Sequence, residues 1–203
     1  MSANIQEFQH TIAKEVSYSG IGLHSGKDVL MTLKPAEANT GVTFIRTDLP
    51  GCPEIKAVAE NVSSTVKATT LSANGAEVFT VEHLMAAIAL SGVDNIRIEM
   101  SSPEPPVTDG SAKVFSELLE EAGLVEQEAE RKVYAVDKAF SVYDGDRYIA
   151  VLPYDGYRIS FTSINNHPML GTQYFDVLLD KESFKKEIMP ARTVAFTYEL
   201  EML

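Results

Sequence analysis

The chain has 203 residues, a hydrophobic content of 45% and a formal net charge of −12 at pH 7. This length allows one large or two small domains, and the hydrophobic content is ordinary for a globular protein with a buried core. The negative charge argues against nucleic acid or an anionic membrane surface as the main partner, because both would repel the protein. A single cysteine, Cys52, excludes an intramolecular disulfide and suits a reducing compartment.

The N-terminus has neither a basic start nor a continuous apolar stretch, so we expect no signal peptide. No run approaches the ~20 apolar residues that are needed to span a bilayer. The sequence therefore predicts a soluble cytoplasmic protein with no transmembrane segment and no nucleic-acid partner.

The first half of the chain alternates β-rich runs with turn signals and then becomes helical. Residues 8–47 are typical of antiparallel sheet. Apolar spacing predicts a helix with Thr80 as its N-cap that reaches about Ser91, and Gly92 is placed to end it. Residues 95–100 alternate as a strand.

A rigid proline-rich loop at 101–106 precedes a second amphipathic helix, predicted over 112–123. The acidic stretch 126–132 has few core residues and is interpreted as a linker. We therefore predict two domains, one over 1–126 that carries the Glu-His pair described below, and one over 127–203.

The second domain begins as sheet. An Asp144-Gly145 turn predicts a hairpin over 139–152, because this dipeptide readily supplies positive φ angles. A further strand is predicted at 158–162 and a helix at 181–188. A half-buried sheet needs a cover on its apolar face, and this chain supplies little of one, so we expect covering helices beyond Leu203.

The adjacent Glu82 and His83 begin the first predicted helix. Neighbouring helical residues point about 100° apart, so one side chain can hold a metal ion while the other reaches a water bound to it. The pattern alone is also common for solvent-facing or hydrogen-bonded core residues. It places the candidate chemistry at this helix without identifying it.

Five separated motifs extend this hypothesis. In order they are GIGLHSG at 20–26, ANTG at 38–41, TVEHLMAA at 80–87, DGSA at 109–112 and ART at 191–193. With them, the chain resembles the UDP-3-O-acyl-N-acetylglucosamine deacetylases, the zinc enzymes that commit bacteria to lipid A synthesis. The resemblance covers essentially the whole chain. It implies an α+β fold of two similar domains, each layering a sheet against two helices around a shared active site, with the second domain incomplete here.

The resemblance also implies roles for individual residues. His83 matches a zinc ligand, and Glu82 matches the general base that takes a proton from the zinc-bound water. Thr193 matches a hydroxyl that helps to stabilise the oxyanion. Arg147 matches a basic position near the nucleotide phosphates, and His24 lies in a family motif that we take as substrate-binding. The implied substrate is UDP-3-O-acyl-N-acetylglucosamine and the implied cofactor is Zn²⁺.

Simpler explanations stay open for several of these residues. Thr193 fits a strand through β propensity alone. Arg147 can be a solvated charge beside a hairpin turn, and His24 can belong to an ordinary glycine-rich turn. His167, which precedes a proline, can bond within its own loop.

One departure from the family pattern changes the expected activity. The other two zinc ligands of the family, in an HKxxDxxGD helix, and its later general-acid histidine do not occur before Leu203. One histidine cannot hold catalytic zinc, since such sites ordinarily use three protein ligands. We expect the 203-residue chain alone to be inactive, with the activity belonging to an intact parent. The alternative is a metal-free binding or regulatory protein that kept the fold.

Overall fold

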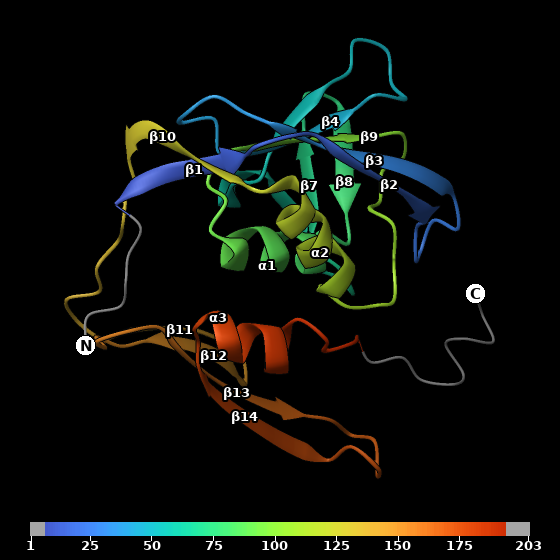
Figure 1. Ribbon diagram of the computed structural model, residues 1–203. Helices are drawn as coiled ribbons and strands as arrows, with labels where there is room; N and C mark the ends of the chain where they lie inside the picture. Colours follow the sequence, from blue (N-terminus) through green and yellow to red (C-terminus); the bar gives the residue numbers. More distant parts are fainter. Residues whose placement is uncertain (1–6, 194–203) are drawn as a thin grey trace.

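A computed structural model describes residues 7–193. The expected α+β class is confirmed: strands form several small sheets, and the helices are few and short. In Figure 1 the helices α1 (Glu82–Ser91) and α2 (Lys113–Ala122) lie under the strands of the N-terminal half. On the other side of these helices lie α3 (Lys181–Ser183) and the hairpins of the C-terminal half.

The main sheet has five strands in the order β2-β3-β9-β4-β5. All neighbours are antiparallel except β4 and β9, which pair in parallel. Alternation sets the faces: along β3 the buried residues are Val29, Met31 and Leu33. The strand bounds are β2 (Val16–Ile21), β3 (Asp28–Pro35), β9 (Ile96–Met100), β4 (Val42–Arg46) and β5 (Glu54–Lys56).

A three-stranded antiparallel sheet lies between β5 and α1 in the sequence. Its order is β6-β7-β8, and a short 3₁₀ helix, η1, precedes it. The bounds are η1 (Ala59–Asn61), β6 (Val62–Ser64), β7 (Thr70–Ala73) and β8 (Ala76–Phe79). This sheet delivers the chain directly to the start of α1.

The predicted linker at 126–132 is wrong. Residues Leu124–Glu130 form strand β10, which pairs antiparallel with β1 (Phe8–Ile12). The glutamates of β10 are exposed, whereas Gln127 is half-buried and bonds inward, donating to the Ala36 carbonyl at 2.8 Å and accepting from Asn95 at 2.7 Å. A polar residue thus takes the inward position of the strand. The proposed division between 126 and 127 stays a prediction, and residues 127–130 pair with the N-terminal half.

Both predicted helices are confirmed, with one correction at the start of α1. Gly92 adopts φ of +81° and ends α1, as expected. Thr80, however, is not the N-cap: Val81 holds that position, with no side-chain cap, and Thr80 has φ of +58°. The core joins the buried faces of these helices to the sheets and includes Phe44, Ile55, Leu84, Ile88, Ile96, Ile98, Phe115 and Leu119.

The C-terminal half consists of two hairpins and a short helical segment. The predicted Asp-Gly hairpin is confirmed, with Gly145 at φ of +60°, and the predicted helix over 181–188 is α3 followed by one π-helical turn, η2. Asp180 and Ser183 cap α3 reciprocally, and these bonds lower the pKa of Asp180. The bounds are β11 (Phe140–Asp144), β12 (Arg147–Val151), β13 (Arg158–Ile164), β14 (Thr172–Leu178) and η2 (Phe184–Ile188).

The hairpins are only partly covered within the described residues. Val177 of β14 and Phe184 of η2 are buried, but many large apolar side chains stay exposed. These are Phe140, Val142, Tyr143, Tyr148, Ile149, Phe161, Ile164 and Tyr174. No helix within residues 7–193 is both long and apolar enough to cross a membrane.

Candidate active site

One cavity, of about 190 Å³, brings together four of the five residues that the sequence singled out. His24, Glu82, His83 and Thr193 all line it, although only Glu82 and His83 are neighbours in the sequence and the four residues come from both halves of the molecule. Its remaining lining residues are Leu23, Lys67, Thr80, Pro105, Pro106, Val107 and Phe115. Arg147, at the start of β12, is exposed and does not line this cavity.

Helix α1 presents Glu82 and His83 to the cavity from its first turn. Val81 and Leu84, on either side of the pair, are buried in the core and hold the helix in place. Glu82 is exposed and His83 half-buried, so both side chains remain reachable from the cavity. The Glu82 carboxylate also accepts a hydrogen bond from the backbone N–H of Thr69. This bond ties the loop between β6 and β7 to the candidate base.

Thr193 reaches the cavity because the loop before α2 holds its backbone. Its N–H donates to the carbonyl of Gly110, with an N–O distance of 3.1 Å. Gly110 sits at φ of +82°, a conformation that glycine adopts without strain. The turn formed by the DGS motif thus holds the segment that carries Thr193 in place.

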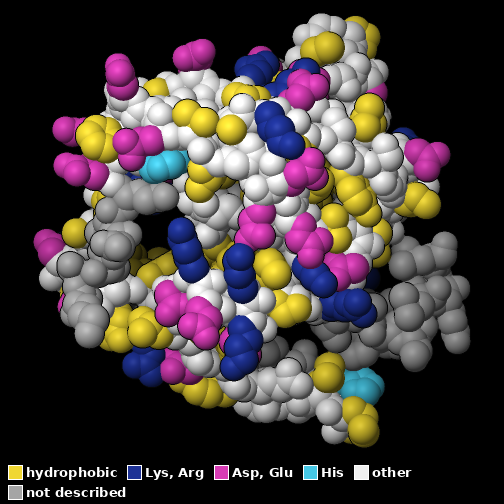
Figure 2. All heavy atoms as spheres, viewed as in Figure 1, with side chains coloured by type: hydrophobic (Ala, Val, Ile, Leu, Met, Phe, Trp, Pro, Cys, Tyr) yellow, Lys and Arg dark blue, Asp and Glu magenta, His cyan; other side chains and the backbone are white. Residues whose placement is uncertain are grey.

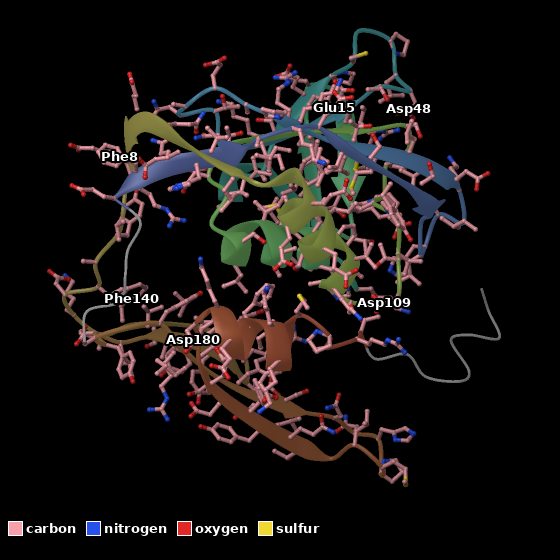
Figure 3. All side chains as sticks on the ribbon, viewed as in Figure 1. Phe8, Glu15, Asp48, Asp109, Phe140 and Asp180 are labelled. Atoms are coloured by element: carbon pink, nitrogen blue, oxygen red, sulfur yellow. The ribbon has the colours of Figure 1, made fainter. Side chains whose placement is uncertain are left out.

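Asp109 stabilises this turn from within. Its carboxylate accepts hydrogen bonds from the Ser111 hydroxyl at 2.7 Å and the Ser111 backbone N–H at 3.1 Å. These bonds, assisted by the charge of Arg192 3.9 Å away, lower the pKa of Asp109. Figure 3 shows Asp109 at the edge of the N-terminal half, next to the segment that follows η2.

A second contact joins the two halves of the molecule through an ion pair. Lys185 of η2 forms an ion pair with Glu120 of α2, with an N–O distance of 2.5 Å. Figure 2 shows acidic and basic side chains gathered across the middle of this face, where the two halves meet. Both side chains of the pair are more than half exposed, so its contribution to stability is small. The pair shows that η2 and α2 lie next to each other.

Sequence reasoning missed the apolar wall of the cavity and one of its cations. Pro105, Pro106 and Val107 form that wall, and the proline-rich loop was interpreted only as a rigid connection. Lys67 enters from the loop between β6 and β7, where its φ of +60° has no obvious sequence signal. His167 bonds within its own loop, as the simpler explanation expected: its Nδ1 accepts a hydrogen bond from the Met169 N–H at 3.2 Å.

The donor set of the cavity falls short of a complete zinc site. Across residues 7–193 no group of three or more His, Cys, Asp and Glu side chains is arranged to hold a metal ion. His83 can serve as one ligand, but catalytic zinc ordinarily takes three from the protein. The described residues alone therefore do not fit a bound catalytic zinc ion.

The cavity nevertheless has the components of a hydrolytic site: a carboxylate that can accept a proton from water, imidazoles, and a hydroxyl that can donate to a developing oxyanion. Comparison with known proteins agrees with this class. Residues 9–203 match the family model described as UDP-3-O-acyl N-acetylglycosamine deacetylase. The chain belongs to this family.

Several curated relatives carry the corresponding name, UDP-3-O-acyl-N-acetylglucosamine deacetylase. The protein from Geotalea uraniireducens is 45% identical over 196 residues, covering 97% of this chain and 64% of the relative. The one from Myxococcus xanthus is 45% identical over 195 residues, covering 96% and 62%, and that from Saccharophagus degradans is 43% identical over 197 residues, covering 96% and 65%. The chain thus spans less than two thirds of the length of these relatives.

Proposed function

We propose that the complete protein deacetylates UDP-3-O-acyl-N-acetylglucosamine in a zinc-dependent reaction, the committed step of lipid A synthesis, in the cytoplasm. One observation carries the proposal: the cavity collects Glu82, His83, His24 and Thr193 from distant parts of the chain. Family membership and the names of the relatives support the same substrate. The net charge of −12 and the single cysteine support a cytoplasmic protein.

The reaction is the hydrolysis of the acetamide on the sugar, an unreactive bond. In our proposal Glu82 is the general base and accepts a proton from the attacking water. The N–H of Thr69 holds one oxygen of this carboxylate, and we propose that the other oxygen accepts the proton. Thr193 donates its hydroxyl hydrogen bond to the oxygen on which negative charge develops. Acetate and a free glucosamine amine are the products.

His83 enters the proposal as one zinc ligand. Because the described residues do not complete the metal site, the remaining ligands, and the acid that protonates the leaving amine, would come from residues outside those described. We therefore propose that the 203-residue chain has no useful turnover unless those groups are supplied.

The substrate-binding roles divide by position. His24 lines the cavity and is proposed to contact the bound sugar nucleotide. Arg147 lies on the exposed hairpin, so a contact with the nucleotide phosphates would have to be made at the periphery of the site. A bidentate guanidinium suits that task chemically.

A second function is supported by the incomplete set of metal ligands among the described residues. A protein of this family that bound its ligand without zinc would be a metal-free binding or regulatory protein. The four cavity residues would then contact the ligand without performing hydrolysis.

The test compares the 203-residue chain with the complete gene product, measuring zinc content and release of acetate from UDP-3-O-acyl-N-acetylglucosamine. The proposal predicts zinc and turnover in the complete protein and neither in the 203-residue chain. Substrate binding without zinc or turnover in both would favour the binding protein. Tight equimolar zinc with turnover in the 203-residue chain would overturn the three-ligand argument.

A further inference from the structure

Glu104 is a charged side chain that the proposed reaction does not use, and it is completely buried. Its relative exposure is 0%, and it lies in the proline-rich loop between β9 and α2. Burying a carboxylate is costly unless hydrogen bonds replace its lost hydration. A buried carboxylate in this position therefore calls for a specific partner.

Its partners are backbone amides of the glycine-rich loop that carries His24. The His24 N–H donates to both carboxylate oxygens, at 3.1 Å to Oε1 and 3.0 Å to Oε2. The Ser25 N–H donates to Oε2 at 2.8 Å. Two successive amides thus converge on one carboxylate, which is the arrangement by which backbone N–H groups hold an anion.

The loop is shaped to fit around this carboxylate. A Cβ atom at Gly22 would stand 2.6 Å from Oε2 of Glu104 and 2.3 Å from Oγ of Ser25, both closer than atoms can approach. The Gly22 N–H donates to the Lys27 carbonyl and the Gly26 N–H donates to the Gly22 carbonyl, each at 3.0 Å, which closes the loop around the site. A side chain at position 22 would therefore displace the Ser25 hydroxyl and the Glu104 carboxylate from their places in the loop.

The hydrogen bonds to Glu104 connect the glycine-rich loop to the cavity through His24. While its backbone is held by Glu104, the His24 side chain is exposed and lines the cavity that Glu82 and His83 also line. The two residues after Glu104, Pro105 and Pro106, line the same cavity, and proline restricts the backbone on that side. Both walls that meet at Glu104 are therefore fixed relative to each other.

We propose that Glu104 is a positioning residue whose buried carboxylate fixes the His24 backbone and so sets the place of the His24 imidazole in the cavity that Glu82 and His83 also line. This inference rests on the proposed function, since it gives the position of His24 a catalytic consequence. Glu104 does not touch the substrate; it acts through His24.

The test uses the complete gene product and the variant Glu104→Gln, which preserves the size of the side chain but replaces one acceptor oxygen with a donor. The control is Glu99→Gln on β9, which removes a partly exposed carboxylate that pairs with Lys34 of β3 outside the cavity. Three quantities are measured in each: kcat and KM for UDP-3-O-acyl-N-acetylglucosamine, the thermal midpoint, and hydrogen exchange of the His24 and Ser25 amides.

We expect Glu104→Gln to lower kcat/KM about tenfold or more, and to speed exchange of the two amides by a similar factor. The Glu99→Gln control changes neither. The decisive readout is the double variant with His24→Ala. If Glu104 acts through His24, adding Glu104→Gln to His24→Ala causes no further loss of kcat/KM, because interacting residues are not additive.

Two results would overturn the inference: a Glu104→Gln loss that is undiminished in the His24→Ala background, or exchange of the His24 and Ser25 amides that Glu104→Gln leaves unchanged. Should Glu104→Gln not fold, Glu104→Asp, which keeps the charge but shortens its reach, takes its place under the same criteria. Should the unmutated complete protein show no turnover, the proposed function fails by itself. The amide exchange then still decides whether Glu104 holds the His24 backbone.

Discussion

Thr193 is anchored by the carbonyl of Gly110, to which its backbone N–H donates a 3.1 Å hydrogen bond. The two residues are 83 positions apart in the sequence, and their bond joins the C-terminal half to the loop before α2. Because the backbone is held in this way, the Thr193 side chain is delivered to the cavity at a defined point. Backbone anchoring leaves the hydroxyl free for chemistry.

The first prediction follows from that separation of roles. Thr193→Val keeps the shape and the backbone bond but removes the hydroxyl, so we expect kcat of the complete protein to fall about 10- to 1,000-fold with KM little changed. Steady-state kinetics on UDP-3-O-acyl-N-acetylglucosamine measures this. Thr172→Val, on exposed strand β14, is the matched control and should leave kcat unchanged. A loss confined to KM would assign Thr193 to binding.

The second prediction concerns His83 as a metal ligand. In the complete protein, His83→Ala should lose zinc during dialysis against a chelator that the unmutated protein withstands, because removing one of three ligands weakens binding strongly. Zinc is measured by elemental analysis after dialysis. The control is His10→Ala, since His10 lies on β1 and its Nδ1 is 3.0 Å from the carbonyl oxygen of Phe8, outside the cavity. Equal zinc retention in the two variants would remove His83 from the metal site.

The third prediction is a pH dependence in the hairpin β13–β14. Arg158 donates to both oxygens of Asp176, at 3.0 and 2.6 Å, and the Ser160 hydroxyl donates at 2.5 Å. These bonds lower the pKa of Asp176 from 3.8 to about 2. Since the folded pKa lies below the unfolded one, the stabilisation is fully present above pH 3.8 and is lost as the pH falls through about 2.

An NMR titration of the Asp176 carboxyl tests this directly. Arg158→Gln should raise the pKa of Asp176 towards 3.8 without fully reaching it, because Ser160 still donates. The comparison variant is Arg147→Gln on the other hairpin, which should leave the pKa of Asp176 where it was. A midpoint near 3.8 in the unmutated protein would show that the three bonds do not persist in solution.

The fourth prediction separates the scaffold of α1 from its chemistry. Leu84, with 0% exposure, follows His83 and packs into the core. Leu84→Ala should lower the free energy of unfolding by about 2–5 kcal/mol, through lost apolar burial and the cavity that remains. Urea unfolding followed by circular dichroism provides the measurement. Leu30→Ala, at a 51% exposed position on β3, should change the free energy of unfolding far less.

Much of the fold follows from the sequence because its signals are local. Gly92 ends α1 and the Asp144-Gly145 turn makes a hairpin, since each depends on a positive φ angle that glycine supplies. Strand β10 was missed because its inward positions are occupied by Gln127 and Ala129, and Gln127 bonds to Asn95, just before β9, and to Ala36, just after β3. Such partners are distant in sequence and leave no periodic apolar pattern.

In the site, too, the features with a sequence signal were predicted and those that depend on distant contacts were not. The pair Glu82–His83 and the segment ending at Thr193 were predicted through family motifs, and the structure brings them to one cavity. Thr80 was misjudged because its side chain type favours an N-cap, whereas the turn from β8 into α1 forces it to φ of +58°. Lys67 and the proline wall depend on how loops pack, which sequence periodicity does not encode.

The central claim is that Glu82 is the general base of an amide hydrolase, and one measurement tests it most directly: kcat for UDP-3-O-acyl-N-acetylglucosamine in the complete protein carrying Glu82→Gln, with zinc content determined on the same sample. We predict a loss in kcat of about 100- to 10,000-fold with zinc retained. Glu77→Gln, an exposed glutamate on β8, is the matched control and should keep full turnover. A Glu82→Gln variant that retains zinc and turns over within about twofold of the unmutated protein would contradict the assignment.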